Sequence, residues 1–413
     1  MQISLRREWS KSRSSGSNKG DIARLMKVMI VPMAAMAETH GPVSRCRALA
    51  YGLKEAGFDV CTCMAKDVNY RAMDDIPNFD LDIPMPLGLP KAIATKTFPV
   101  AQRLGITSKK TVNSFDQVLF LTGNLDYKYL KKSVSSVRKA IQEDQPDIVY
   151  SEFNISAIIA AKKEGVSLYL TVSYPTQYAY ACDSKLGRGL NKLLKELGLP
   201  RVEPPVGLFD WADQYFCMSI RELEPIDKPN VIYCGSLKSV VTNPPTTGKR
   251  NKIVVYMGNG TVSAKKMLSV ITGAFTGSIY EVYVASAYLK EGSFGNIHVA
   301  PRWDFGRLLE EAVVFINHGG QNSIVDGLIH GVPQIVVPGK VFERRFNSKC
   351  LVDNQAGIAI EPQSFRAEDI REAVKSILEK PEIVDHAIML GRKLSEAGGI
   401  QTVIKGIKEL GIR

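Results

Sequence analysis

The feature of the sequence that most constrains the fold is an alternation of short apolar runs and amphipathic stretches, which begins at Lys27. The apolar runs, among them KVMIVPM, FDVCTC, DIVYS, SLYLTV and QYFCM, are separated by segments such as VSRCRALAYGLKEAG, in which apolar residues recur at helical spacing. Short continuous apolar runs are typical of strands buried on both faces, and helices between them indicate parallel connections. The pattern therefore predicts an α/β fold built on parallel sheets.

The alternation is interrupted once, over residues 236–251, where Pro244 and Pro245 lie among polar residues. It then resumes with KIVVYM, YEVYVA, NIHVA, VVFIN, QIVVP and GIAIE. A polar, proline-containing stretch between two periodic blocks is typical of a linker, and 413 residues exceed what one ordinary core organises. We therefore predict two Rossmann-like, doubly wound α/β domains that face a central cleft, with ligands at the carboxyl ends of the strands.

The predicted parts are a disordered basic extension (1–26), an N-terminal domain (27–235), the linker (236–251), a C-terminal domain (252–384) and C-terminal helices (385–413), for which packing back on the first domain is one option. Composition agrees with globular domains, because 45% of the residues are hydrophobic and 23% are charged. No apolar run approaches the roughly 20 residues of a membrane-spanning helix. The seven cysteines include no Cys-x-x-Cys pair, which favours a reduced compartment and a cytoplasmic location.

The net charge of +11 is concentrated in two places. Residues 1–26 hold six Lys and Arg against two acids, and residues 87–142 hold ten against two. No nucleic-acid recognition motif accompanies these cations, so nucleic acid is not an expected partner. Residues 87–142 mix cations with apolar side chains, which suits an anionic membrane surface, although a solvated helix face has the same composition. Peripheral attachment at the inner face of the membrane is thus one option.

The most informative segment is VVFINHGGQNSIVDGLIHGVPQIVVPGKVFERRFN, residues 313–347. A buried strand runs up to His318, two glycines follow, and a helix begins near Gln321. The two glycines let backbone N–H groups approach an anion closely, and the helix dipole adds about half a positive charge there. Because His318 and Ser323 can donate further hydrogen bonds, the segment predicts a diphosphate cradle that needs no metal. Asp326, three residues beyond Ser323 on the same helix face, suits two adjacent ribose hydroxyls.

These residues resemble the donor-binding signature of GT-B glycosyltransferases, H-G-G-x-x-S-x-x-E-x-x-x-x-G-x-P, followed by a proline, an acid-Gln pair and an asparagine. The resemblance is sharp over residues 299–350 and extends as alternating architecture over most of 27–413. The matching positions are His318, Gly319, Gly320, Ser323, Asp326, Gly331, Pro333, Pro338, Glu343, Arg344 and Asn347. Two of them depart from the signature, since Asp326 replaces Glu and Arg344 replaces Gln. The second departure leaves the donor sugar open and allows an acidic or unusual one.

By this resemblance, His318, Asn322 and Ser323 contact the diphosphate, Asp326 the ribose, and Glu343 the hydroxyls of the donor sugar. The segment 298–312 matches the base-binding loop, where Trp303 is a candidate stacker and a Trp packed in the core is the alternative. Residues 258–261 follow a strand, and we expect their amides and the Thr261 hydroxyl to reach the phosphates. The predicted donor-binding residues are Gly258, Gly260, Thr261, Arg302, Trp303, His318, Gly319, Gly320, Asn322, Ser323, Asp326, Glu343 and Asn347.

An inverting sugar transfer needs a base that accepts the proton of the acceptor hydroxyl. In the resembling family this base is commonly a histidine after the first strand, oriented by an acid after a later strand. Here Pro42 stands at the usual histidine position, His40 lies two residues earlier in the same loop, and Glu152 occupies the place of the acid. We therefore predict His40 as the base and Glu152 as the residue that orients it, with Glu38 as a further candidate base.

The sequence thus predicts a glycosyltransferase that moves a sugar from a nucleotide-diphosphate sugar, with UDP-sugars as first choice, to an acceptor hydroxyl. The resemblance implies an inverting reaction without metal or other cofactor, in which the N-terminal domain binds a lipid-linked or small-molecule acceptor. Two alternatives remain open. Because proline cannot accept a proton, the chain could be a catalytically impaired nucleotide-binding subunit. Non-hydrolysing nucleotide-sugar epimerases share the fold, but their set of residues around the sugar is not traceable here.

Overall fold

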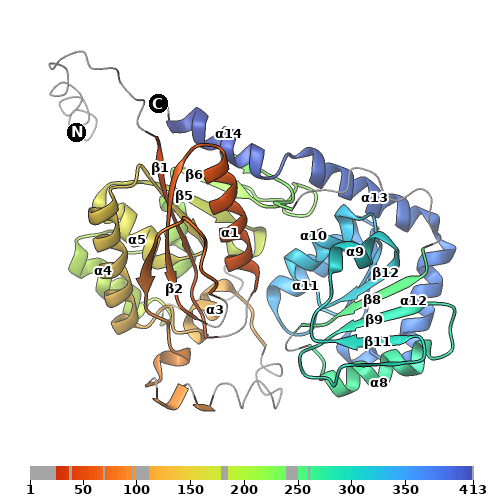
Figure 1. The fold of residues 1–413 in the computed structure, drawn as a ribbon. Coiled ribbons are helices and arrows are strands. Elements are labelled where there is room, and N and C mark those ends of the chain that lie inside the picture. Colours follow the sequence, from red (N-terminus) through yellow and green to blue (C-terminus); the bar gives the residue numbers. More distant parts are fainter. Residues whose placement is uncertain are drawn as a thin grey trace.

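The computed structural model describes residues 25–36, 40–67, 70–90, 92–94, 96–97, 111–177, 185–238, 250–258 and 261–411. These residues form two α/β units, each built around a seven-stranded sheet, and Figure 1 shows the units side by side. The predicted basic extension and linker lie mostly outside the described residues. The prediction of two doubly wound, Rossmann-like sheets is confirmed.

The first sheet is parallel throughout, in the strand order β3-β2-β1-β4-β5-β6-β7. Its strands are β1 (Lys27–Pro32), β2 (Asp59–Ala65), β3 (Asn78–Leu81), β4 (Ile148–Glu152), β5 (Ser167–Val172), β6 (Gln214–Cys217) and β7 (Val231–Tyr233). The order reverses between β1 and β4, which pair with Met29 opposite Val149. In a doubly wound sheet this switch point leaves a crevice at the carboxyl ends of the strands.

The second sheet has the order β10-β11-β9-β8-β12-β13-β14, and only the edge strand β10 is antiparallel among the described strands. Its strands are β8 (Lys252–Tyr256), β9 (Glu281–Ala285), β10 (Gly292–Phe294), β11 (Ile297–Ala300), β12 (Ala312–Asn317), β13 (Gln334–Val336) and β14 (Gly357–Ala359). Here the order reverses between β8 and β12. The segment that resembles a donor signature therefore begins at the switch point of this sheet.

Helices cover both faces of each sheet, as continuous apolar strands require. In the first unit they are α1 (His40–Glu55), α3 (Phe115–Leu121), α4 (Tyr127–Asp144), α5 (Ile155–Glu164), α6 (Tyr174–Gln177) and α7 (Arg188–Leu197). In the second unit they are α8 (Ala264–Phe275), α9 (Phe305–Glu310), α10 (Gln321–Ile329), α11 (Phe342–Asp353), α12 (Ala367–Glu379) and α13 (Pro381–Glu396). Each unit thus buries its own apolar core between sheet and helices.

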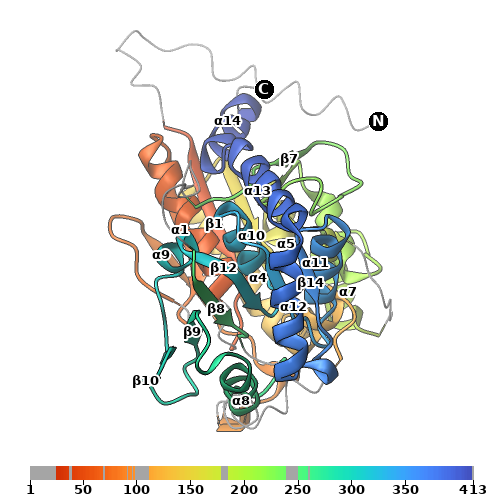
Figure 2. The ribbon, with the colours of Figure 1, turned by 90° about the vertical axis from the view of Figure 1, so that its right-hand side faces the viewer.

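The last helix, α14 (Ile400–Gly411), returns to the first unit. Its Val403 and Ile407 are fully buried in the same cluster as Leu49 and Leu53 of α1. The preceding helix α13 packs on α10 instead, through Leu390 and Leu394. Figures 1 and 2 show α13 and α14 as one path that runs from the second unit to the first. The C-terminal segment therefore ties together the two units that carry the cleft.

The contact between α13 and α10 predicts the result of a substitution at Gly391. A Cβ there would lie 1.9 Å from the carbonyl oxygen of Leu328, so the two helices touch through backbone atoms. Gly391→Ala is expected to lower the stability by about 1–3 kcal/mol, the usual cost of overpacking, despite the better helix propensity of alanine. Thermal unfolding measures this. Gly273→Ala in α8 is the control, because a Cβ there would lie 3.3 Å from its nearest neighbour, the Ala367 Cβ. This variant should leave Tm unchanged or raised. Equal Tm values for the two variants would contradict the close backbone contact between α13 and α10.

Candidate donor-binding site

The two sheets direct the carboxyl ends of their strands into one cleft of about 1110 Å³, which exceeds the volume of most small-molecule sites. Residues that directly follow a strand line it from both units. They are Met33 after β1, Phe153 after β4, Ser173 after β5, Met257 after β8, Ser286 after β9, Pro301 after β11 and His318 after β12. The predicted central cleft is therefore present between the described residues of the two domains.

The turn between β12 and α10 is built as an anion cradle. Gly319 has a φ of +81°, a conformation that favours glycine, and its N–H donates to the Asn317 side chain at 2.8 Å. Gly320 is the N-cap of α10 and, having no side chain, cannot cap the first turn. The N-terminal amides of α10 and the positive end of its dipole therefore face the cleft, where Gly320, Asn322 and Ser323 form part of the wall.

His318 lies at the bottom of this cradle with its ring held on three sides. A Cβ at Gly320 would lie 2.8 Å from its Nε2, and a Cβ at Gly258 would lie 3.2 Å from the ring. The ring meets Tyr256 edge to face at 5.4 Å, and Nδ1 lies 3.4 Å from the Tyr256 carbonyl oxygen. Burial, together with the nearby Arg344 guanidinium, lowers the pKa of His318 to about 3, so the imidazole is neutral at physiological pH.

Two charged residues of α11 and one threonine continue the wall next to the cradle. Glu343 and Arg344 lie in the first turn of α11 and line the cleft. Arg344 donates from Nη1 to the Thr261 hydroxyl at 3.1 Å. Burial lowers the pKa of the Arg344 guanidinium, although it remains protonated in any ordinary buffer. This part of the wall therefore places a guanidinium and a carboxylate of opposite charge beside the anion cradle.

Asp326 and Trp303 also line the cleft, each fixed by a neighbour. The Asp326 carboxylate lies 2.6 Å from the Lys238 ammonium, a residue that comes after β7 of the first unit. Burial raises the pKa of Asp326, while Lys238 acts in the opposite direction. Trp303 donates from Nε1 to the Val284 carbonyl oxygen at 3.1 Å and packs edge to face on Tyr283. Its indole is thus anchored in the second domain while it remains part of the cleft wall.

Some predicted donor residues lie elsewhere. Asn347 is buried and donates from Nδ2 to the Gly319 carbonyl oxygen at 2.9 Å, so it supports the turn from behind and is absent from the cleft wall. Gly319 likewise faces Val336 and the backbone of α11. These contacts give both residues a supporting role in the turn, and their direct contact with the donor stays a prediction. Gly258 and Arg302 do line the cleft, and Gly260 lies outside the described residues.

Of the three predicted catalytic residues, only the side chain of Glu152 lies among the described residues. Glu38 and the side chain of His40 lie outside the described residues, so their proposed roles as bases stay predictions. Glu152 is 0% exposed and forms an ion pair with Arg45 of α1, whose Nε lies 2.6 Å from Oε1. A base must reach the substrate, and Glu152 lies behind Arg45 rather than in the cleft wall. Arg45, in contrast, lines the cleft.

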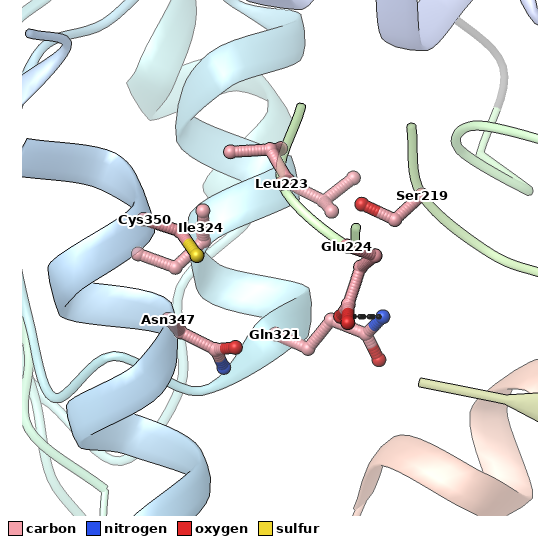
Figure 3. Close-up of a pocket in the computed structure, with 8 residues that line it drawn as sticks. Ser219, Leu223, Glu224, Gln321, Ile324, Asn347 and Cys350 are labelled. Atoms are coloured by element: carbon pink, nitrogen blue, oxygen red, sulfur yellow. Dashed lines mark hydrogen bonds between the residues drawn. The ribbon is translucent and has the colours of Figure 1, made fainter. Parts of the chain in front are cut away.

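A buried acid at the junction of the two domains escaped the sequence interpretation. Glu224 accepts a hydrogen bond from the Tyr174 backbone N–H at 2.6 Å. It accepts a second one from Gln321 Nε2 at 3.2 Å (Figure 3). Burial raises its pKa to about 8. The side chain belongs to the loop after β6, and Gln321 is the first residue of α10. No sequence motif marks Glu224, Arg45 or Lys238, because each has a partner that is distant in sequence and lies across the domain junction.

The basic surface predicted over 87–142 is partly paired. On α4, Lys131, Lys132 and Arg138 form ion pairs with Glu196, Asp82 and Glu164, respectively. Parts of the segment lie outside the described residues, and its attachment to a membrane surface stays a prediction. Among the described helices, none combines the length and the apolar character needed to cross a membrane.

Comparison with known proteins agrees with this geometry. Solved structures with the same architecture include the glycotransferase of kitacinnamycin, with a TM-score of 0.71 at 16% identity over 94% of this chain and 99% of that chain. The calicheamicin glycosyltransferase CalG4 gives a TM-score of 0.70 at 15% identity, over 94% of this chain and 98% of that chain. The chain has the GT-B fold. The fold-class prediction is thereby confirmed, and a likeness at this identity shows the fold alone.

Sequence comparison adds a relationship over the C-terminal half. Residues 291–410 match the family described as erythromycin biosynthesis protein CIII-like, C-terminal domain. The chain is 25% identical over 177 residues to the uncharacterized UDP-glucosyltransferase YdhE of Bacillus subtilis, which covers 41% of this chain and 44% of that protein. It is 30% identical over 100 residues to the aclacinomycin-T 2-deoxy-L-fucose transferase of Streptomyces galilaeus, 24% and 23% of the two chains. The chain thus matches less than half the length of these relatives.

Proposed function

We propose that this protein is a glycosyltransferase that moves a sugar from a nucleotide-diphosphate sugar to an acceptor hydroxyl. The observation that carries the proposal is the β12–α10 cradle, which opens at the switch point of the second sheet into a cleft large enough for both substrates. It is supported by the match of residues 291–410 to the erythromycin biosynthesis protein CIII-like C-terminal domain, and by the relatives named as glycosyltransferases. A UDP-sugar is the first donor to test, because the relatives include proteins named for UDP-sugars.

The donor would lie along the wall of the second domain. In this arrangement the base lies near Trp303, the ribose near Asp326, the diphosphate on the N-terminal turn of α10, and the sugar near Glu343 and Arg344. The helix N-terminus and the neutral His318 stabilise the negative charge that develops on the leaving diphosphate. We further propose that the reaction inverts the anomeric centre and needs no divalent metal.

The acceptor side of the cleft carries a group of apolar side chains beside polar ones. Met33, Phe115, Val118 and Phe153 line it from the first domain, and Phe342 lines it from the second. Burial of such side chains favours an acceptor that presents an apolar surface beside its reactive hydroxyl, at about 25 cal/mol per Å² of apolar area removed from water. A lipid-linked or apolar small-molecule acceptor therefore fits better than a polar oligosaccharide.

The proposal is tested by a screen of nucleotide sugars with the full-length protein. UDP-, dTDP- and GDP-sugars are added one at a time, and Tm is measured; a ligand at 100 times its Kd stabilises the fold by about 2.7 kcal/mol. Radiolabelled forms of the donors that bind are then incubated with apolar acceptors, with and without EDTA. A glycosylated product that forms equally in EDTA is expected. Interconversion of the free nucleotide sugars indicates an epimerase, and binding without turnover indicates an accessory subunit.

His318→Ala is expected to weaken binding of the donor by about 10-fold to 100-fold, the effect of losing a hydrogen bond of about 1.5–3 kcal/mol to a charged group. Because the pKa of His318 is about 3, the loss should be the same at pH 6 and pH 8. Isothermal titration with the donor measures both values. The half-buried His298, which pairs with Glu281 and packs against Tyr283, offers a control in His298→Ala. Unchanged donor affinity in folded His318→Ala would contradict the cradle.

A further inference from the structure

Arg45 is the one described side chain of the first domain that hydrogen-bonds to Asn322 in the cradle helix. Its side chain is 12% exposed and extends from α1 into the cleft. Nε donates to Glu152 Oε1 at 2.6 Å, and Nη1 donates to the amide oxygen of Asn322 at 3.1 Å. Nη1 also lies 3.4 Å from the amide oxygen of Gln321. Arg45 therefore joins a buried acid of one domain to the first turn of α10 in the other.

The anchoring of Arg45 is rigid. Glu152 is fully buried at the end of β4, and the Phe153 ring lies 5.6 Å from the guanidinium carbon. Glu152 Oε2 has no hydrogen-bond partner among the described residues, so Arg45 supplies the hydrogen bond on which this buried carboxylate depends. The guanidinium cannot swing into solvent without leaving a buried charge unpaired. It is therefore held at a fixed place in the cleft wall.

The contact with Asn322 fixes which atoms an anion would meet. A guanidinium is a donor only, so the Asn322 amide must turn its oxygen toward Arg45. Its NH₂ group is then available to the cleft, together with the backbone amides of α10. Without Arg45 the amide could present its oxygen to the anion, which would be repulsive. Arg45 thus turns the NH₂ group of Asn322, rather than its oxygen, toward an anion in the cradle. It also places its guanidinium beside the backbone amides of α10.

We propose that Arg45 is a positioning residue of the diphosphate site, through which the first domain closes on the donor and stabilises the leaving group. The proposal rests on the proposed glycosyltransferase function and adds a residue to it. In the transfer, the bond between the anomeric carbon and the β-phosphate oxygen breaks, and its electron pair stays on the nucleoside diphosphate. The acceptor oxygen bonds to the anomeric carbon, and its proton passes to a base or to water. Arg45 offsets the charge gained by the diphosphate.

Arg45 binds only one oxygen of Glu152, and Oε2 has no hydrogen-bond partner among the described residues. The role of Glu152 in orienting His40 stays a prediction, because the His40 side chain lies outside the described residues. The Glu152–Arg45 pair brings guanidinium donors to the wall of the first domain.

The experiment compares Arg45→Met, Arg45→Lys and Arg47→Met in the full-length protein. Arg47 is a matched control, since it lies on the same helix and donates instead to the carbonyl oxygens of Arg71 and Ala72. Titration calorimetry gives Kd for UDP and for uridine, and initial rates with a UDP-sugar give kcat and KM. If the wild-type protein prefers another base in the nucleotide screen, the corresponding diphosphate and nucleoside are used.

Arg45→Met is expected to weaken UDP binding at least 10-fold and to lower kcat by a similar factor, while the affinity for uridine stays unchanged. Arg45→Lys should recover part of the UDP affinity, and Arg47→Met should match the wild-type protein. A loss confined to the diphosphate separates this role from a structural one. If Arg45→Met does not fold, Arg45→Met combined with Glu152→Gln removes both charges and keeps the test possible.

Three outcomes overturn the proposal in distinguishable ways. If the wild-type protein binds UDP, and the folded Arg45 variants bind it equally with unchanged kcat, the positioning role is wrong and the proposed function stands. If the wild-type protein binds no nucleotide diphosphate at all, the proposed function and the role of Arg45 fail together. Equal loss of UDP and uridine binding in Arg45→Met also overturns it, because that result indicates a general loss of structure.

Discussion

The Gly320→Val substitution is expected to reduce the affinity for a nucleotide diphosphate about 100-fold or more while the protein stays folded. Gly320 has φ −66° and ψ 141°, values that a β-branched residue adopts readily. A Cβ there would lie only 2.8 Å from His318 Nε2 and would stand at the N-terminus of α10, where the anion is proposed to bind. Loss of two hydrogen bonds to a charged group, at about 1.5 kcal/mol each, corresponds to that factor.

The control for this variant is a glycine outside the cradle. A Cβ at Gly207 would have its nearest neighbour, the Val202 Cβ, at 3.7 Å, so Gly207→Ala should change neither Tm nor binding. Titration with UDP, or with the diphosphate selected by the screen, measures the affinity, and circular dichroism verifies folding. A folded Gly320→Val protein with wild-type affinity would place the diphosphate elsewhere in the cleft.

The same cradle shows why sequence was informative about part of the site. The two glycines, His318 and Ser323 lie within six consecutive residues, so their mutual geometry follows from one strand, one turn and one helix. Local geometry of this kind is encoded in local sequence. The alternation of apolar runs likewise predicted the strands, because burial on both faces leaves a continuous apolar signature.

Residues whose partners come from the other domain could not be predicted in this way. Arg45 on an amphipathic helix has the sequence pattern of a solvated cation, and only the structure places it between Glu152 and Asn322. Lys238 and Asp326 are 88 positions apart and meet across the domain junction. For Asn347 the structure adds a contact that the signature did not indicate, since its amide donates to the Gly319 carbonyl oxygen, and its donor contact stays a prediction.

The wall of the first domain departs most from the expectation of a histidine base. Pro42 lines the cleft where the resembling family has histidine, and the nearby Arg45 is permanently charged. Neither side chain can accept a proton. The described part of this wall therefore supplies apolar contact and positive charge, which suit acceptor binding and leaving-group stabilisation. The predicted bases His40 and Glu38 precede Pro42 in the sequence, and their roles stay predictions.

The pH dependence of stability is expected to depend on Glu224. Its carboxyl is fully buried beside a cavity of about 10 Å³, room for about one water molecule (Figure 3). Its pKa is about 8 in the folded protein and about 4.5 when unfolded. Tyr174 and Gln321 donate hydrogen bonds to the Glu224 carboxyl. Two charged groups also act on its pKa: Glu343 raises it and Arg45 lowers it.

The sign follows from proton binding. Between pH 4.5 and pH 8 the folded state holds a proton on Glu224 that the unfolded state has released, so the free energy of unfolding falls as pH rises. The fall attributable to this group is about 1.4 kcal/mol for each pH unit inside that window, and it levels off above pH 8. Glu224→Gln keeps the neutral state at every pH. The difference in free energy of unfolding between Glu224→Gln and the wild-type protein should therefore increase by the same amount for each pH unit inside that window.

Urea unfolding of the two proteins at pH 5.5, 6.5, 7.5 and 8.5 measures this difference. Glu222→Gln provides the matched control, because Glu222 lies two residues away on the same loop and pairs with Lys393, which lowers its pKa. Glu222 is ionised at all four pH values, so its variant should differ from the wild-type protein by a constant. Parallel curves for Glu224→Gln and the wild-type protein would show that Glu224 is already ionised at pH 5.5. In that case the junction would hold a permanent charge, and the Gln321 amide and Arg45 would be the groups that stabilise it.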